Sequence, residues 1–289
     1  MIKDFFVLTK FVLSFAVSLS ALFAYIMAKG EFGVDMFTAT FAVLLVALGV
    51  STINQVQEYK EDAKMERTKH RPIASGKWSP RTGLAIAGVL IVSSMVLIYN
   101  LLGITGLNLF LFSFIWYNGF YTPLKKKSAL AVVPGALLGV VPPAIGWLAA
   151  GHSLMEHEFY ALGLFYFIWQ IPHFWLLVMF HHAEYNGAGY PTALRLFGRN
   201  SLQRLTFVWM FFTILAGAYM ADVFIISNTA IAYVLVLAAI LCYASSFQLL
   251  IKNFELKHAR KVFWQFNVLF LLTVILVAVD VMLEHSALN

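Results

Sequence analysis

Nine apolar runs, each near the length that crosses a lipid bilayer, dominate this sequence. They lie at about residues 8–28, 36–56, 82–101, 105–121, 129–150, 159–180, 204–222, 229–250 and 262–283. A helix of about 20 apolar residues spans the hydrocarbon core of a bilayer, where only helices or closed barrels satisfy the backbone polar groups. Charged residues make up 12% of the chain, against about 25% in a soluble domain. The sequence therefore predicts an all-α membrane protein with nine transmembrane helices.

The basic residues predict the orientation of these helices. If the N-terminus is cytoplasmic, every Lys and Arg except Lys29 falls in an inner segment. Short cytoplasmic segments carry the excess of Lys and Arg in membrane proteins. We therefore expect a multi-pass protein of the cytoplasmic or inner membrane, with its N-terminus cytoplasmic and its C-terminus outside. The net charge of +6 then mainly reflects topology.

The chain is expected to form one domain over residues 1–289, because no Pro-, Gly- or Ser-rich linker divides it. Residues 1–28 could also be a signal peptide. Their apolar run is longer than the usual run of about 7–15 residues in such a peptide, and eight more runs follow. We therefore assign it as a helix of the domain. The lone cysteine, Cys242, excludes an internal disulfide.

A dense polar segment, NQVQEYKEDAKMERTKHRP, runs from Asn54 to Pro72 after the second apolar run. Asn54, Glu58 and Asp62 recur every four residues and therefore share one face of a helix. Two carboxylates four residues apart repel each other unless a cation lies between them. At the edge of a membrane, this pattern indicates a Mg²⁺ site.

Basic residues follow these acids, at Arg67, Lys69 and Arg71. Such cations would weaken a site for a bare metal ion, but they suit a diphosphate that carries Mg²⁺. Mg²⁺ is typically held by one or two carboxylates together with phosphate oxygens, and Arg binds phosphate through two parallel hydrogen bonds. The alternative is an interfacial loop whose acids pair with its bases and whose cations contact anionic lipid.

Two further polar sets lie on the same predicted side of the membrane. Glu184 follows the sixth run, in the second long inner loop, and could supply a ligand for a second cation. Lys125 lies in YTPLKKKS at the inner end of the fourth run and could reach a phosphate. The alternatives are an ordinary loop acid and a lysine run that only sets topology.

Prolines and one histidine interrupt the fifth and sixth runs. Pro134, Pro142 and Pro143 lie in the fifth run and Pro172 in the sixth. Each proline favours a kink, which a membrane helix tolerates where neighbours or a cavity satisfy the freed carbonyls. The fifth run could therefore line a cavity, or its prolines could serve packing alone. His173 lies inside the sixth run, and ionisable residues at membrane depth are functional candidates, although a neighbouring helix could also satisfy a neutral histidine.

Together these motifs resemble a known family. Asn54-x3-Glu58-x3-Asp62, running into MERTKHRP, is similar to the first Asp-rich motif of the UbiA-type intramembrane prenyltransferases. YTPLKKKSAL, PPAIGW, WQIPHF and EYNGAG resemble, in that order, the heme O synthase (protoheme IX farnesyltransferase) branch. The resemblance covers about residues 50–195. It implies a UbiA-type bundle of nine helices with both polar loops in the cytoplasm.

The resemblance also implies an activity, the transfer of a farnesyl group from farnesyl diphosphate to a vinyl group of heme B. The products would be heme O and diphosphate, and the cofactor Mg²⁺. The implied metal ligands are Asn54, Glu58, Asp62 and Glu184. The implied diphosphate-binding residues are Arg67, Lys69, Arg71 and Lys125. The implied catalytic residues are Asn54, Glu58, Asp62, Arg67 and Lys125. His173 would face the heme, as a porphyrin contact or an iron ligand.

The chain departs from the family pattern at two places. Glu58 and Glu184 stand where the family more often has Asp, and His182 stands where members often carry Arg. Each Glu is one methylene longer than Asp and would bind Mg²⁺ from a shifted backbone, and His182 lowers the positive charge at the second acidic site. The protein is expected to lie in the lipid bilayer, and its implied protein partner is a heme A synthase or a terminal-oxidase maturation protein. No nucleic acid partner is expected.

Two alternatives differ in function. One is a UbiA-type prenyltransferase that acts on another aromatic or tetrapyrrole acceptor, which the resemblance of WQIPHF and the Pro-Pro run to the heme branch disfavours. The other is a non-catalytic heme-handling or transport protein. Transport would favour ionisable residues spread through the spans, whereas here they gather at one membrane face.

Overall fold

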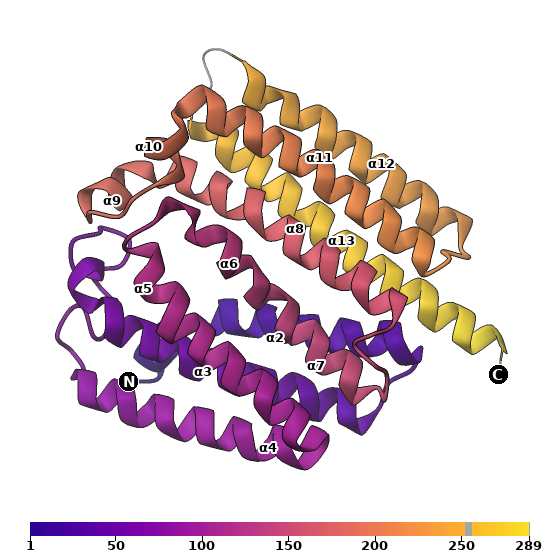
Figure 1. The fold of residues 1–289 in the computed structure, drawn as a ribbon, viewed down its shortest axis with the longest axis horizontal. Coiled ribbons are helices and arrows are strands. Elements are labelled where there is room, and N and C mark those ends of the chain that lie inside the picture. Colours follow the sequence, from indigo (N-terminus) through magenta and orange to yellow (C-terminus); the bar gives the residue numbers. More distant parts are fainter. Residues whose placement is uncertain (252–255, 289) are drawn as a thin grey trace.

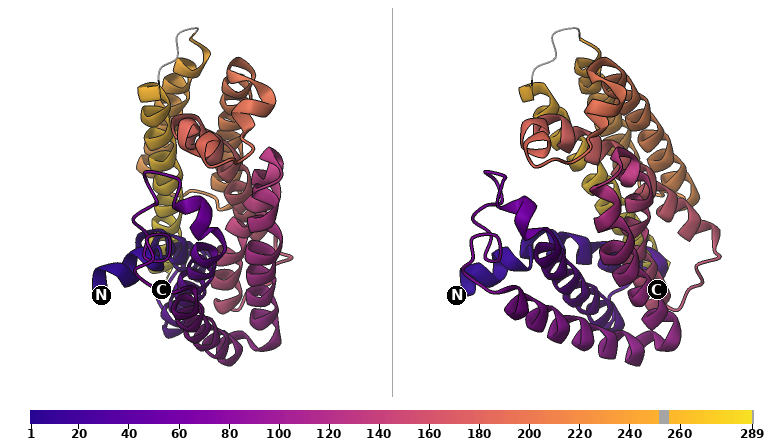
Figure 2. Two further views of the ribbon diagram at one scale, coloured as in Figure 1. Left: turned by 90° about the vertical axis from the view of Figure 1, so that its left-hand side faces the viewer. Right: turned by 60° about the vertical axis from the view of Figure 1, so that its left-hand side comes forward.

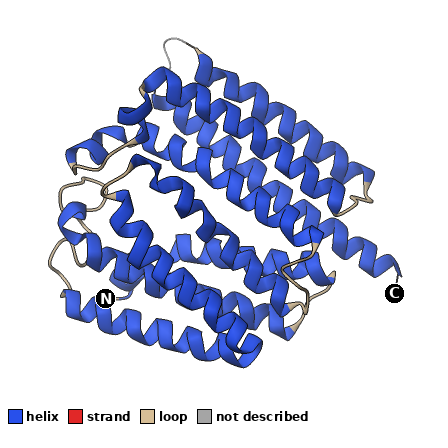
Figure 3. Cartoon of the chain, in the orientation of Figure 1, coloured by secondary structure: helices blue, strands red, loops and turns tan. Residues whose placement is uncertain are grey.

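The computed structural model describes residues 1–251 and 256–288, and all regular structure within these ranges is helical (Figure 3). In chain order the elements are α1 (Ile2–Leu8), α2 (Phe11–Lys29), α3 (Val34–Asp62), α4 (Pro80–Phe114), η1 (Ile115–Tyr121), α5 (Thr122–Lys125), η2 (Ala129–Ala131), α6 (Val132–Ala136), η3 (Leu137–Val140), α7 (Val141–Ala149), α8 (His157–Phe180), α9 (His182–Gly187), α10 (Ala193–Phe197), α11 (Arg199–Val223), α12 (Thr229–Ser246), η4 (Phe247–Leu250) and α13 (Leu256–Leu288). Among the described residues, eight helical segments are long and apolar enough to cross a membrane.

One of these eight segments, Pro80–Lys125, contains two of the nine predicted spans. Gly103 interrupts it with φ 58° and ψ −143°, a conformation that glycine adopts without a steric penalty. Gly83 packs against Val56, and Lys125 reaches Glu58. Both ends of the segment therefore lie at the same end of α3, and the chain reverses at Gly103 (Figure 1). The prediction of an all-α, multi-pass membrane protein is confirmed.

The first span begins later than the sequence predicts. Lys10 has a left-handed backbone (φ 48°, ψ 46°) and separates the short helix α1 from α2, which starts at Phe11. The predicted span is present, and its start lies about three residues later than predicted. A non-glycine residue in this conformation leaves no local sequence signal. The break turns Lys10 toward the end of α3.

The second span is longer than predicted. The apolar run predicts an end near residue 56, but α3 continues to Asp62. The extra turn keeps Asn54, Glu58 and Asp62 on one continuous helix, as their spacing requires. The fifth run is broken, as its prolines predict, into η2, α6, η3 and α7.

The helices form two groups (Figures 1 and 2). Helices α2, α3 and α4 pack together in one group, and α8, α11, α12 and α13 in the other. The broken segment contacts both, through α2 with α7 and through α6 with α8. Its close approach to α2 depends on Gly146, where a Cβ would overlap the backbone carbonyl of Ala21.

We predict that Gly146→Val destabilises the protein. The added side chain must push α2 and α7 apart, and overpacking of a tight contact costs about 1–3 kcal/mol. The check is the melting temperature of the purified protein in detergent, which should fall. Gly88→Val on α4 is the matched control, since a Cβ there meets nothing within 4 Å. Equal melting temperatures for the two variants would contradict the prediction.

Candidate functional site

A cavity of about 670 Å³ lies between the two groups of helices. The polar residues that line it come from the ends of α3 and α5 and from the following loops, and include Asn54, Glu58, Asp62, Arg71 and Lys125. Its apolar wall includes the broken fifth segment, with Gly135, Gly139 and Pro142, and aromatic residues of α8 and α13. The structure thus confirms that the fifth run lines a cavity. We call the Asn54–Asp62 region the polar end.

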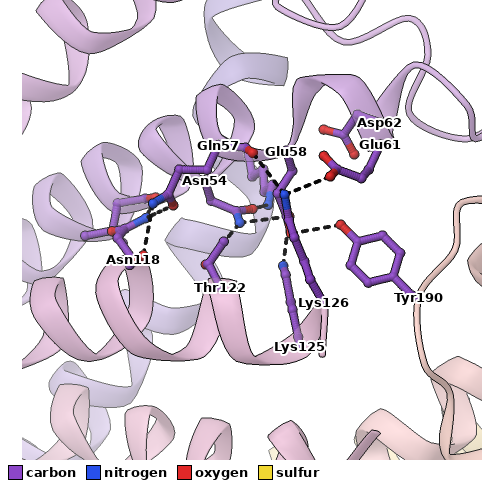
Figure 4. A network of polar contacts seen from close by, with 12 residues as sticks. Asn54, Gln57, Glu58, Glu61, Asp62, Asn118, Thr122, Lys125, Lys126 and Tyr190 are labelled. Atoms are coloured by element: carbon purple, nitrogen blue, oxygen red, sulfur yellow. Dashed lines mark hydrogen bonds and ion pairs between the residues drawn. The ribbon is translucent and has the colours of Figure 1, made fainter. Parts of the chain in front are cut away.

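Asn54, Glu58 and Asp62 are exposed by only 1%, 5% and 3%. Glu58 accepts hydrogen bonds from Asn54 Nδ2 at 2.8 Å, from Lys125 Nζ at 2.8 Å and from the Tyr190 hydroxyl at 2.9 Å (Figure 4). These donors come from α3, α5 and the loop before α10. Three elements distant in sequence therefore meet at one carboxylate.

Asp62 is held by the loop that follows it. Arg71 Nη1 lies 2.9 Å from Asp62 Oδ1 and 2.8 Å from Oδ2. The Thr68 hydroxyl donates to the Asp62 carbonyl at 2.9 Å, which folds this loop back over the end of α3. A buried carboxylate needs such a partner, because an unpaired buried charge is strongly destabilising.

The second inner loop meets the first through Arg67, which lines the cavity. The Arg67 backbone N–H donates to Glu184 Oε2 at 3.4 Å, and its Nε lies 4.0 Å from the same oxygen. His181 Nδ1 lies 3.5 Å from the other oxygen, and burial and then Arg67 lower the pKa of His181. Glu184 itself is outside the cavity lining. Lys69 is also outside it and forms an exposed ion pair with Glu66 at 2.6 Å.

Two residues that line the cavity, Lys10 and Tyr190, are not among the site residues predicted from the sequence. Lys10 donates from Nζ to Asn54 Oδ1 at 2.7 Å. Burial, followed by the nearby charges of Arg71 and Lys125, lowers the pKa of Lys10 to about 7. In the sequence, Lys10 stands out only as one of the basic residues that indicate topology. Tyr190 lies directly after the EYNGAG motif, and burial together with Glu58 raises the pKa of its hydroxyl.

The polar end could bind Mg²⁺ only together with an anion. Among the described residues, no three His, Cys, Asp or Glu side chains gather closely enough to hold an ion. Asn54, Glu58 and Asp62 supply oxygen donors, which Mg²⁺ prefers, and phosphate oxygens or water would complete its shell. Lys10, Lys125 and Arg71 would repel a bare cation but attract a diphosphate.

His173 lines the cavity on α8, away from the polar end. Its ring lies 4.7 Å from that of Trp169 and 4.9 Å from that of Phe263, measured between centroids. Its Nδ1 lies 2.7 Å from Asn267 Oδ1 on α13. The cavity therefore joins a charged end, fit for a diphosphate, to an aromatic region that contains one histidine.

Several bacterial proteins are similar to this chain in sequence. Protoheme IX farnesyltransferase of Oleidesulfovibrio alaskensis is 38% identical over 175 residues, which cover 61% of this chain and 62% of that protein. The enzyme of the same name from Geobacter sulfurreducens is 36% identical over 54% of this chain and 57% of its own length. That from Nitratidesulfovibrio vulgaris is 33% identical over 72% of each. The matches thus span less than two thirds of the first two relatives.

Solved structures share the fold. A UbiA homolog from Archaeoglobus fulgidus bound to GPP and Mg²⁺ has a TM-score of 0.71 at 13% identity, over 96% of this chain and 99% of that one. A structure described for digeranylgeranylglyceryl phosphate synthase has a TM-score of 0.78 at 15% identity, over 97% and 98%. The model of the UbiA prenyltransferase family matches residues 16–274. Since this match covers most of the sequence, the chain belongs to the UbiA prenyltransferase family.

Proposed function

We propose that this protein transfers the farnesyl group of farnesyl diphosphate to a vinyl group of heme B, giving heme O and diphosphate. The observation that carries the proposal is the single cavity that joins Asn54, Glu58 and Asp62 to an aromatic region containing His173. The relatives named protoheme IX farnesyltransferase, at 33–38% identity, support the same acceptor.

At the polar end, the reaction must stabilise a leaving diphosphate. Asn54, Glu58 and Asp62 would hold Mg²⁺, which supplies positive charge to the diphosphate oxygens when bound. Lys125 and Arg71 already point at Glu58 and Asp62, so they lie where the charge on the diphosphate grows. Charges fixed in place before the reaction stabilise a transition state without reorganisation. Arg67 is a further candidate, whereas Lys69 in its exposed pair with Glu66 has the weakest geometric support.

The rest of the cavity must protect an allylic cation. As the C–O bond breaks, its electron pair leaves with the diphosphate, and the vinyl π electrons form the new C–C bond. Water then adds to the resulting cation and a proton is lost, which gives the hydroxyethylfarnesyl side chain. Tyr117 and Tyr121, with ring centroids 5.7 Å apart, line the cavity beside Lys125. Aromatic faces attract cations, and an apolar wall excludes water until the bond has formed.

Glu184, which contacts Arg67, would belong to a second acidic site. A second Mg²⁺ bound there would also need phosphate oxygens as ligands. The whole chain acts as one catalytic domain, with its N-terminus in the cytoplasm. The product would pass to a heme A synthase or a terminal-oxidase maturation partner.

The central prediction concerns the reaction itself. Purified protein with heme B, farnesyl diphosphate and Mg²⁺ should form heme O, detected by its mass, and EDTA should stop the reaction until Mg²⁺ is restored. Parallel samples should contain other aromatic and tetrapyrrole acceptors. Unchanged heme B together with a prenylated alternative acceptor would contradict the proposed acceptor while leaving prenyl transfer intact.

A second prediction concerns Asp62. Asp62→Asn removes a charge from the metal–diphosphate site, and loss of one transition-state interaction costs about 100-fold or more in kcat. Steady-state kinetics with the folded variant should show this loss. Glu66→Gln is the matched control, because it removes an acid with an 81% exposed side chain from the same segment. A similar kcat for Asp62→Asn and Glu66→Gln would remove Asp62 from the site.

A third prediction concerns pH. Because the pKa of Lys10 is about 7, its ammonium loses a proton as the pH rises through 7, and the cavity loses a positive charge. The KM for farnesyl diphosphate should therefore rise between pH 6 and 8.5. Lys10→Arg, which stays charged, should flatten this rise, and Lys10→Met should have a high KM at every pH. Parallel pH profiles for the wild type and Lys10→Arg would exclude Lys10 as the titrating group.

A further inference from the structure

A polar contact joins α8 and α13 in the apolar part of the cavity lining. His173 Nδ1 lies 2.7 Å from Asn267 Oδ1, and both residues line the cavity. The ring of His173 is otherwise surrounded by Trp169, Phe174 and Phe263. A polar pair in such surroundings is costly unless each atom has a partner. The direction of its hydrogen bond therefore determines what the imidazole can bind.

The Asn267 side chain is fixed by a second contact. Its Nδ2 donates to the Phe263 carbonyl at 2.6 Å, one turn earlier on α13. Rotating the amide by half a turn would place two acceptor oxygens against each other at this distance. Oδ1 therefore faces His173, and because Oδ1 only accepts hydrogen bonds, His173 Nδ1 must carry the proton.

This tautomer leaves a lone pair on the other ring nitrogen. A neutral imidazole has one N–H, so Nε2 of His173 is an acceptor or a metal ligand. Within the described residues, the one side-chain hydrogen bond of His173 is made through Nδ1. A histidine that binds a metal through one nitrogen usually donates the other N–H to a carbonyl or carboxylate, which orients the ring. Asn267 has this relation to His173.

A second observation also points to a ligand in this region. The indole N–H of Trp169, one turn before His173 on α8, is buried and has no hydrogen-bond acceptor. Buried donors without partners are rare in folded proteins. Trp169 lines the same cavity, so a bound molecule with an acceptor group would satisfy this donor.

We propose that Nε2 of His173 binds the iron of the heme substrate and that Asn267 is the positioning residue that fixes the tautomer and the ring. This inference rests on heme being the acceptor in the proposed function. The hydrogen bond and ring contacts of His173 are with Asn267 and neighbouring aromatic residues, and not with Asn54, Glu58 or Asp62. The iron is thereby kept apart from the polar end, so that a peripheral vinyl group rather than the metal meets the allylic carbon.

The test is the absorption and EPR spectrum of ferric heme B added to the purified full-length protein, with heme O formation measured in parallel. The wild type should show the signature of histidine-bound heme. His173→Ala should lose this signature, and added imidazole should restore it, which also shows that the variant is folded. His157→Ala, at the opposite end of α8, is the control and should match the wild type.

Asn267 is tested by two variants. Asn267→Leu should weaken heme binding about 10–100-fold, as loss of such a supporting hydrogen bond typically does, and should change the EPR signal of the bound heme. Asn267→Asp keeps an acceptor oxygen and should restore the affinity. An Asn267→Leu protein with the wild-type affinity and EPR signal would overturn the positioning role.

The outcomes separate this inference from the proposed function. If the wild type makes heme O and His173→Ala keeps both the wild-type spectrum and its turnover, iron binding by His173 is wrong and the reaction stands. If the wild type prenylates a different acceptor and heme B gives no histidine-bound spectrum, both proposals fall. If it shows the spectrum without forming heme O, the iron site stands and the reaction fails.

Discussion

The structure depends on the burial of two carboxylates at the end of α3. Glu58 and Asp62 are almost fully enclosed, and each is paired with a cation from another segment, Lys125 and Arg71. Removing one partner from such a pair typically costs about 3–5 kcal/mol, because the other charge stays buried. These two ion pairs therefore hold α5 and the loop after α3 over the polar end. The hydrogen bond from Tyr190 to Glu58 holds the second inner loop there as well.

The same pairing makes the site compatible with its proposed substrate. A metal–diphosphate carries positive charge for Glu58 and Asp62 and negative charge for Lys125 and Arg71. Each group can therefore exchange its present partner for one on the substrate without leaving a charge unpaired. A cavity lined by acids alone would repel the diphosphate, and one lined by cations alone would repel the metal. Mixed charge at the polar end serves both folding and binding.

The sequence predicts the parts of this site that are local to one helix. The apolar runs give the spans, and the four-residue spacing gives the face shared by Asn54, Glu58 and Asp62. Contacts between distant segments carry no such signal. Lys10 joins the site only because a left-handed residue separates α1 from α2, and Tyr190 joins because its loop folds back to Glu58. Asn267 lies in an apolar run and is revealed only by its contact with His173.

The broken fifth segment explains how one cavity can join two chemically different regions. Its glycines allow close contacts with side chains of neighbouring segments. A Cβ at Gly135 would meet Tyr121, and one at Gly139 would overlap Gln170. Both neighbours line the cavity as well. The breaks near Pro134 and Pro142 free backbone carbonyls, which a membrane protein tolerates beside a cavity or where another group satisfies them. Trp116 does so for Pro134, donating from its indole to the carbonyl at 2.8 Å. An unbroken helix with larger side chains would fill the space between the polar end and His173, and the two proposed substrates could not meet.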